Sequence, residues 1–129
     1  MTLVKDNPVA APFGDRFAHV ARIEGAFLVT AGQVAVDDAG VLVAPGDVVA
    51  QAERIFEILG GILAAHGAGF ADVAHVRTFM TNLDDLPGYG SVRRRYFPAD
   101  PLASTTVEVN RLFLPGAVLE IELTAAVPG

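Results

Sequence analysis

The chain of 129 residues contains no cysteine, no tryptophan and only two methionines. The lack of cysteine excludes disulfides, thiolate zinc sites, iron–sulfur clusters and a cysteine nucleophile. It also fits a reducing compartment, and we expect a cytoplasmic protein. The three histidines, His19, His66 and His75, do not have the spacing of metal ligands. We therefore expect neither a metal site nor a cofactor.

Long apolar runs and an excess of basic charge are also missing. The longest uninterrupted stretch of apolar residues and glycine covers residues 58–65, far short of the ~20 residues of a membrane-spanning helix. No apolar signal core follows the N-terminal lysine, so we expect no export. The chain has nine Lys and Arg and 15 Asp and Glu, which gives a net charge of −6. This charge disfavours binding to the phosphate backbone of nucleic acids. We expect no membrane partner and no nucleic-acid partner.

Hydrophobic residues, in contrast, are abundant. They make up 52% of the chain, and its mean hydropathy is +0.44. The length suits one domain over residues 1–129. Because a monomer of this size buries only about two-thirds of its unfolded surface, the surplus of apolar residues predicts a subunit interface or an apolar ligand cleft.

The first half of the chain predicts a hairpin followed by a helix. Two β-like runs, 17–23 and 26–33, flank Gly25, and the first dozen residues, which hold two prolines, read as an arm over the domain. Turn residues fill 34–46. Asp47 then caps a helix whose apolar residues recur at spacings of three and four, and Gly67 ends it. We expect the Gly60-Gly61 pair to let this helix approach a sheet.

The second half alternates strands with one shorter helix. Residues 73–81 read as a strand, 86–96 as a helix that Pro98 ends, and 104–110 and 118–126 as two further strands. The predicted order is β-β-α-β-α-β-β, an α+β fold with both helices on one face of a mixed sheet. Nothing left in the chain covers the second face, which again predicts a partner subunit.

Seven motifs, in order through nearly the whole chain, resemble the RidA/YjgF family of reactive-intermediate deaminases. They are Thr30-Ala31-Gly32-Gln33, Gly46-Asp47 with Gln51, Gly67 with Phe70-Ala71-Asp72-Val73, Phe79-Met80-Thr81-Asn82-Leu83, Tyr96-Phe97-Pro98, Thr106-Val107-Glu108-Val109 and Leu119-Glu120-Ile121-Glu122.

The resemblance implies a chorismate-mutase-like fold, a homotrimer around a central barrel and three clefts at the subunit boundaries. Deaminating members hydrolyse enamines or imines of amino-acid metabolism to keto acids and ammonia. An arginine before the fourth main strand clamps the substrate carboxylate through two parallel hydrogen bonds. A glutamate on the last strand and the backbone of the TSGQ-like segment hold the attacking water.

Carried over position by position, the resemblance keeps part of this site. The glutamate falls on Glu120 and the glycine on Gly32, but Ser104 stands where the clamping arginine is expected. At three other family positions the residue differs. Ala31 stands where the family has a serine, Ala18 or His19 where it has an aromatic residue, and Gly90 where it has an asparagine.

We take Glu120 as the catalytic candidate, because a carboxylate in a cleft can hold or deprotonate water. Its alternative role is an ordinary outward-facing strand residue. The candidates for substrate binding are Ser104, Thr106, Gly32, Ala31, His19, Phe79, Gly90 and Arg93. Arg93 offers a replacement contact for an anion, with a solvated helix face or an intersubunit salt bridge as the simpler alternatives.

Two functions follow from these residues. The first is a RidA-like hydrolase or deaminase that acts on a small imine or enamine in an intersubunit cleft, with altered specificity. The second is a non-catalytic trimer of the same fold that binds a small metabolite, because a neutral Ser104 hydroxyl cannot balance an anion. A ribonuclease or translation inhibitor, a role also attached to the family, is disfavoured by the net charge of −6.

Overall fold

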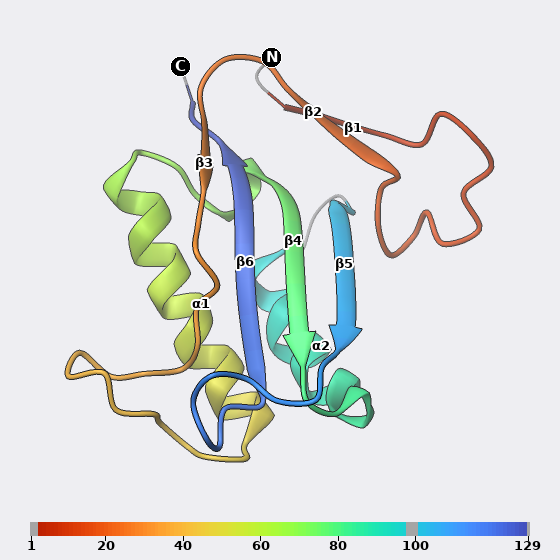
Figure 1. Ribbon diagram of the computed structural model, residues 1–129. Helices are drawn as coiled ribbons and strands as arrows, with labels where there is room; N and C mark the ends of the chain where they lie inside the picture. The colour runs from red at the N-terminus through yellow and green to blue at the C-terminus, as the bar shows by residue number, and fades with distance from the viewer. Residues whose placement is uncertain (1–2, 98–100, 129) are drawn as a thin grey trace.

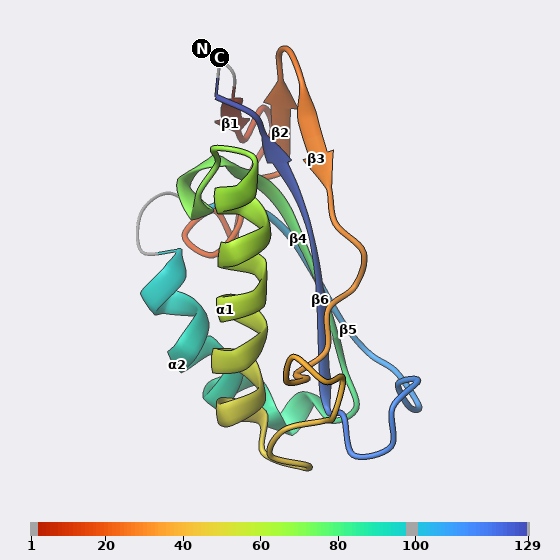
Figure 2. The same cartoon turned by 90° about the vertical axis from the view of Figure 1, so that its left-hand side faces the viewer.

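The computed structural model describes residues 3–97 and 101–128, and in this part of the chain two helices lie against one face of a mixed sheet (Figures 1 and 2). The sheet has the order β3-β6-β4-β5. Its strands are β3 (Phe27–Val29), β4 (Val73–Met80), β5 (Ala103–Glu108) and β6 (Leu119–Ala126), and the helices are α1 (Val48–Ala65) and α2 (Leu86–Tyr96). Strands β4 and β5 are parallel, whereas β6 runs antiparallel to its neighbours β3 and β4. The predicted α+β fold is confirmed.

Helix α1 begins and ends as its sequence predicts. The Asp47 side chain accepts a hydrogen bond from the Ala50 N–H at 3.1 Å, and Gly67 follows the helix with φ of +72°. The expectation for its glycine pair is wrong in one respect. A Cβ at Gly60 would lie 3.3 Å from the ring of Phe70, whereas one at Gly61 would meet nothing within 4 Å. The close approach is therefore made to the aromatic ring after the helix and not to the sheet.

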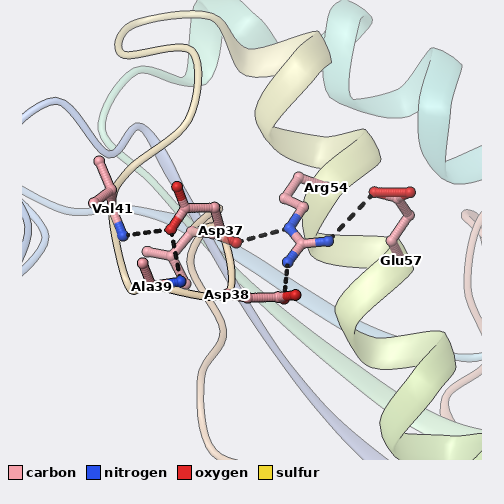
Figure 3. Close-up of polar contacts among 7 residues, drawn as sticks. Asp37, Asp38, Ala39, Val41, Arg54 and Glu57 are labelled. Atoms are coloured by element: carbon pink, nitrogen blue, oxygen red, sulfur yellow. Dashed lines mark hydrogen bonds and ion pairs between the residues drawn. The ribbon is translucent and has the colours of Figure 1, made fainter.

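The turn-rich segment before α1 is tied to the helix by side chains (Figure 3). Asp37 Oδ1 accepts hydrogen bonds from the N–H groups of Ala39 and Val41, both at 2.9 Å, and so closes a tight loop. Arg54, which projects from α1, donates from Nε to the Val36 carbonyl at 2.7 Å. These contacts hold the loop against the helix.

The N-terminal strands pair differently from the prediction. Strand β1 (Leu3–Asp6) pairs antiparallel with β2 (Val20–Ile23) in a separate two-stranded sheet, and β3 pairs with β6. The predicted hairpin between 17–23 and 26–33 is therefore wrong, and part of the expected arm is a strand. The chain turns at Gly25, which has φ of +97°, but the strand after it adds to the edge of β6, whose apolar side packs on the helices. Pairing of sequence neighbours is a tendency and not a requirement.

The later elements match the prediction within two residues at each end. Helix α2 spans the predicted residues and follows a short 3-10 turn, η2 (Leu83–Asp85). A second such turn, η1 (Phe70–Asp72), precedes β4. Pro98, expected to end α2, lies outside the described residues.

Five aromatic rings hold α2 against α1. The ring of Phe56 on α1 stacks on Tyr96 at a centroid distance of 4.6 Å and on Tyr89 at 6.4 Å, and Phe70 and Phe97 contact it edge-on. Such pairs contribute about 0.5–1.5 kcal/mol beyond the area that they bury. The cluster thus fixes the position of α2 over the sheet. Among the described residues, neither helix is long and apolar enough to cross a membrane.

Side chains of the central strands alternate between the two faces of the sheet. Val76, Thr78 and Met80 of β4 and the matching residues of β6 are buried under the helices. The opposite face, here called the open face, is covered by no helix in the described part of the chain (Figure 2). Its residues are Phe27 and Val29 of β3, His75, Arg77 and Phe79 of β4, Thr105 and Val107 of β5, and Glu120, Glu122 and Thr124 of β6.

Candidate functional site

The structure places the candidate residues in two groups on opposite faces of the sheet. Ser104 and Thr106 of β5 lie in register with Val76 and Thr78, whose side chains face the helices. Glu120 of β6 lies in register with Phe79 on the open face. One chain therefore does not bring Glu120 together with the serine and threonine of β5.

On the open face, the Glu120 carboxylate lies against the backbone of Gly32. A Cβ at residue 32 would overlap Glu120 Oε2 and would lie 2.8 Å from its Cδ, so a side chain at this position would displace the carboxylate from where it lies. The segment is held along β6 by paired bonds between the backbones of Gln33 and Ile121, at 2.8 and 3.1 Å. Thr30 Oγ1 also accepts from the Leu123 N–H at 2.9 Å. The sheet thus places the Glu120 carboxylate beside the backbone of Gly32.

The electrostatics of the open face set the proton affinity of Glu120. Burial raises the pKa of Glu120 above the ordinary glutamate value, and the negative charge of Glu122 raises it further. Glu122 is itself paired with Arg77 Nε at 2.8 Å, and the same guanidinium lies 5.8 Å from the centre of the Phe79 ring. Among the described side chains, none forms an ion pair with Glu120. A carboxylate with a raised pKa and no cationic partner is suited to accept a proton from water.

The second group lines a groove of about 620 Å³ between α2 and β5, here called the α2–β5 groove. The loop before β2 closes one side of it. The lining residues are Asp15, Arg16, Phe17, Leu86, Tyr89, Gly90, Arg93, Arg94, Phe97, Pro101, Leu102, Ser104 and Thr106. Ser104, Thr106, Gly90 and Arg93, four of the residues named from the sequence, therefore share one groove.

Arg93 is held across this groove from α2 to β5. Its Nη2 donates to Ser104 Oγ at 3.1 Å and its Nη1 to the Tyr89 hydroxyl at 3.4 Å. The guanidinium also lies over the rings of Tyr89 and Phe97, at 5.9 and 5.8 Å from their centres. The Tyr89 hydroxyl is anchored in turn on Thr78 Oγ1 at 2.7 Å. The guanidinium is therefore oriented by neutral groups.

The neighbouring arginines behave differently. Arg94 lines the α2–β5 groove, whereas Arg95 points away from it and pairs with Glu53 at 2.9 Å. This divergence follows from the ~100° between successive helical positions. Gly90 leaves room in the groove, since a Cβ there would approach nothing nearer than Arg94 Nη1 at 3.5 Å.

The remaining candidates lie elsewhere. Ala31 is exposed beside Gly32, and its carbonyl accepts from the Gln33 side chain at 3.2 Å. His19 is exposed outside the α2–β5 groove, and its backbone N–H donates to Asn7 Oδ1 at 2.7 Å.

On the open face, burial and the charge of Arg77 lower the pKa of His75, and a smaller effect of Glu122 opposes them. No group of three possible metal ligands occurs among the described residues.

Sequence reasoning missed Phe17 as a member of the groove. The family's aromatic position was sought near residues 18 and 19, but Ala18 is buried and Phe17 is the ring that lines the groove. Allowing a one-residue shift before the Thr30 motif would have found it. Asp15 and Arg16 were also missed, because no periodic pattern marks a loop that folds over a distant helix.

Known proteins resemble this chain over most of its length. The family model described as endoribonuclease L-PSP matches residues 9–127. Protein DfrA of Myxococcus xanthus is 42% identical over 73% of this chain and 71% of its own length. The 3-aminoacrylate deaminase RutC of Acinetobacter baylyi is 31% identical over 74% of this chain and 75% of its own, and the 2-iminobutanoate/2-iminopropanoate deaminase of Capra hircus is 31% identical over 73% and 68%.

A solved structure extends the similarity to the fold. The Rid-family protein YyfB of Yersinia pestis, a protein of unknown function, has 34% identity and a TM-score of 0.83, and the match covers 97% of this chain and 98% of that one. The relatives named above include imine and aminoacrylate deaminases. With a matching family model over residues 9–127 and the two-helix, mixed-sheet fold in place, the chain belongs to the RidA/YjgF family.

Proposed function

We propose that the protein is a RidA-like deaminase that hydrolyses a small imine, or an enamine after its conversion to the imine, with a specificity altered by the serine at position 104. The observation that carries this proposal is the Glu120 carboxylate, which has a raised pKa and lies against the backbone of Gly32. The deaminase names of two relatives support the same reaction class.

Glu120 would act on the attacking water. As the water oxygen bonds to the imine carbon, Glu120 accepts the proton and the electron pair of the C=N bond moves to nitrogen. Glu120 passes this proton to the nitrogen. It then takes the proton of the adduct's hydroxyl and passes it to the nitrogen as well, so that the C–N bond breaks, ammonia leaves, the carbonyl forms and Glu120 is again ionised. Water plus imine gives carbonyl compound plus ammonia, so no cofactor is required. A positioned acid–base group of this kind contributes about 10²–10⁴ in rate.

The proposed cleft lies between subunits of a homotrimer. Glu120 is on the open face and the α2–β5 groove is on the helix side of the sheet, so a complete site takes each half from a different copy. The open face also carries exposed apolar side chains, with Phe27 59% and Val29 69% exposed. Burial of these residues against a second copy would account for the high mean hydropathy.

The decisive assay measures ammonia release from enzymatically generated 2-aminoacrylate and related imines. The wild-type protein should accelerate release over a no-protein control, and Glu120→Gln should lose about 10²–10⁴ of that acceleration. Glu53→Gln, an exposed carboxylate on α1, is the matched control and should keep full activity. Release equal to the no-protein rate with every imine tried would contradict the proposal.

Oligomeric state is tested by sedimentation. We expect the mass of three chains at micromolar concentration. A stably folded monomer at that concentration would overturn the proposed intersubunit cleft.

A non-catalytic binding protein of the same fold is the second candidate. It is favoured by Ser104, a neutral residue at the place where the resemblance implies a clamping arginine. Saturable binding of a small metabolite, with no ammonia release and no effect of Glu120→Gln, would favour this function over the first.

A further inference from the structure

We propose that Arg93 of helix α2, oriented by Ser104, binds the carboxylate of the ligand in the α2–β5 groove. The inference rests on the proposed function and specifies its substrate class, a small imino or enamino acid with one free carboxylate. Ser104 is then the acceptor that positions a guanidinium supplied by the facing helix.

The first argument is the hydrogen-bonding capacity that Arg93 retains. A guanidinium has five N–H donors in a planar fork. Two contacts occupy it in the described residues, one to Ser104 Oγ and one to the Tyr89 hydroxyl, which leaves three donors for a ligand. No described carboxylate forms an ion pair with Arg93. A fork with remaining donors matches the two oxygens of a carboxylate.

The second argument is the orientation of the Ser104 hydroxyl. Its oxygen accepts from Arg93, so its own hydrogen is directed elsewhere. A hydroxyl both donates and accepts. Ser104 can therefore donate to a ligand oxygen while it holds the guanidinium, and together they present a charged and a neutral donor to one anion.

The third argument is charge and shape. Arg16, Arg93 and Arg94 line the groove with a single carboxylate, Asp15, a local positive excess in a chain of net charge −6. The rings of Phe17 and Phe97 supply apolar walls. A small organic anion fits this lining better than an uncharged or cationic ligand.

The test measures anion binding without turnover. The probes are 2-oxobutanoate, a 2-oxo acid of the kind that imine hydrolysis releases, and its uncharged methyl ester, titrated calorimetrically into the full-length protein. We expect the wild type to prefer the acid and Arg93→Ala to bind the acid about 10- to 100-fold more weakly, from the loss of charged hydrogen bonds. Binding of the ester should not change.

Three further variants make the result specific. Arg93→Lys should fall between wild type and Arg93→Ala, because it keeps the charge and loses the fork. Arg95→Ala, the matched control, removes a guanidinium paired with Glu53 outside the groove and should leave binding unchanged. Adding Ser104→Arg to Arg93→Ala returns a guanidinium to the groove from β5 and should restore the preference for the acid.

The inference is overturned if the wild type binds acid and ester equally, or if Arg93→Ala keeps the affinity for the acid. It is also overturned if Arg93→Ala lowers the oligomeric mass, since Arg93 would then be an intersubunit contact. Different results would contradict this inference and the proposed function. Arg93-dependent binding without ammonia release would sustain the inference and contradict deamination, whereas normal deamination with an unchanged KM in Arg93→Ala would do the reverse.

Discussion

Glu120 owes its chemical character to two neighbours on its own sheet. Gly32 lets the carboxylate lie against backbone, and Glu122 on the same face of β6 adds a second negative charge. Both burial and the like charge disfavour the ionised form. A base made in this way is stronger than an exposed glutamate, at a cost to the stability of the fold at neutral pH.

The first prediction concerns the pH dependence of activity and stability at Glu120. Activity should fall on acidification through the raised pKa of Glu120, at a pH above that of an ordinary glutamate. For stability the sign is fixed by linkage. The folded state binds this proton more tightly than the unfolded chain, so the free energy of unfolding decreases as the pH rises from the ordinary glutamate value through the raised one.

Glu120→Gln removes this titration. The variant should be more stable than the wild type at pH 7, and the difference should vanish at a pH below the ordinary glutamate value. Urea unfolding at a series of pH values checks the prediction. A variant less stable than the wild type at neutral pH would show that the carboxylate has a partner that stabilises its charged form.

A second prediction concerns the buried hydroxyl pair that anchors Arg93. Tyr89 and Thr78 are each about 1% exposed and their hydroxyls are 2.7 Å apart. Tyr89→Phe leaves Thr78 Oγ1 without that partner and should cost about 1–3 kcal/mol of unfolding free energy. The double variant Tyr89→Phe with Thr78→Val removes both polar groups and should recover most of the loss. A double variant that is destabilised by the sum of the single effects would contradict the coupling.

At the scale of elements, the start of α1 is joined to the rest of the molecule by one buried amide. Gln51 is fully buried and donates from Nε2 to the carbonyls of Ala44 and Gly116, both at 3.0 Å. Its Oε1 accepts from the Val118 N–H at 3.0 Å. One side chain thus connects the helix with the loop before it and the loop that leads into β6, the strand that carries Glu120.

The third prediction is that Gln51→Leu destabilises the fold although leucine favours a helix. The change leaves the Val118 N–H without its acceptor, at about 1–3 kcal/mol. The Ala44 and Gly116 carbonyls keep their backbone donors, the N–H groups of Asp47 and Gly46. Chemical denaturation measures the loss. Glu57→Gln on the exposed side of the same helix is the control, with a change within about 0.5 kcal/mol. Equal stability of Gln51→Leu and the wild type would mean that other groups satisfy the backbone.

At the scale of the whole molecule, the sheet separates the two halves of the proposed site. Glu120 and Gly32 lie on the open face, whereas Arg93 of α2 and Ser104 of β5 lie on the helix side of the sheet. In the homotrimer proposed above, the open face of one copy would lie beside the groove of the next, and rotational symmetry would repeat this contact at each interface. The site would then exist only in the oligomer, and the two halves could be inactivated separately.

The fourth prediction uses that separation. When each variant is assayed by itself, at carboxylate substrate concentrations below the wild-type KM, Glu120→Gln and Arg93→Ala should both have little activity. Unfolding and refolding them together in equal amounts should restore about a quarter of the wild-type activity, since random mixing in a closed ring pairs two intact halves at one interface in four. Mixing without refolding is the control and should restore little. No recovery in a mixture shown to contain hybrid oligomers would place both halves in one subunit.

Much of the fold follows from local sequence patterns. Asp47 and Gly67 delimit α1, and the alternation in β4 and β6 assigns each side chain to a face, because these features depend on neighbours within a few residues. The pairing of β2 with β1 could not be read in this way. Strand pairing depends on the relative stability of alternative pairs between segments that are far apart in the chain. Here β3 pairs with β6 and not with β2, its neighbour in the sequence.

The candidate site, like the fold, has features that local sequence predicts and features that depend on packing. The residue types and their order along the chain show the family motifs and the absence of cysteine chemistry. The resemblance assigns the family's glutamate to Glu120 and puts Ser104 where an arginine is expected. The packing of the elements is needed to see that Arg93 reaches Ser104 from α2, that Phe17 lines the groove, that Glu120 contacts Gly32, and that Glu120 lies on the opposite face of the sheet. The physical reason is that residue types and local periodicity are carried by short segments, whereas distances between side chains depend on how helix, strand and loop pack together.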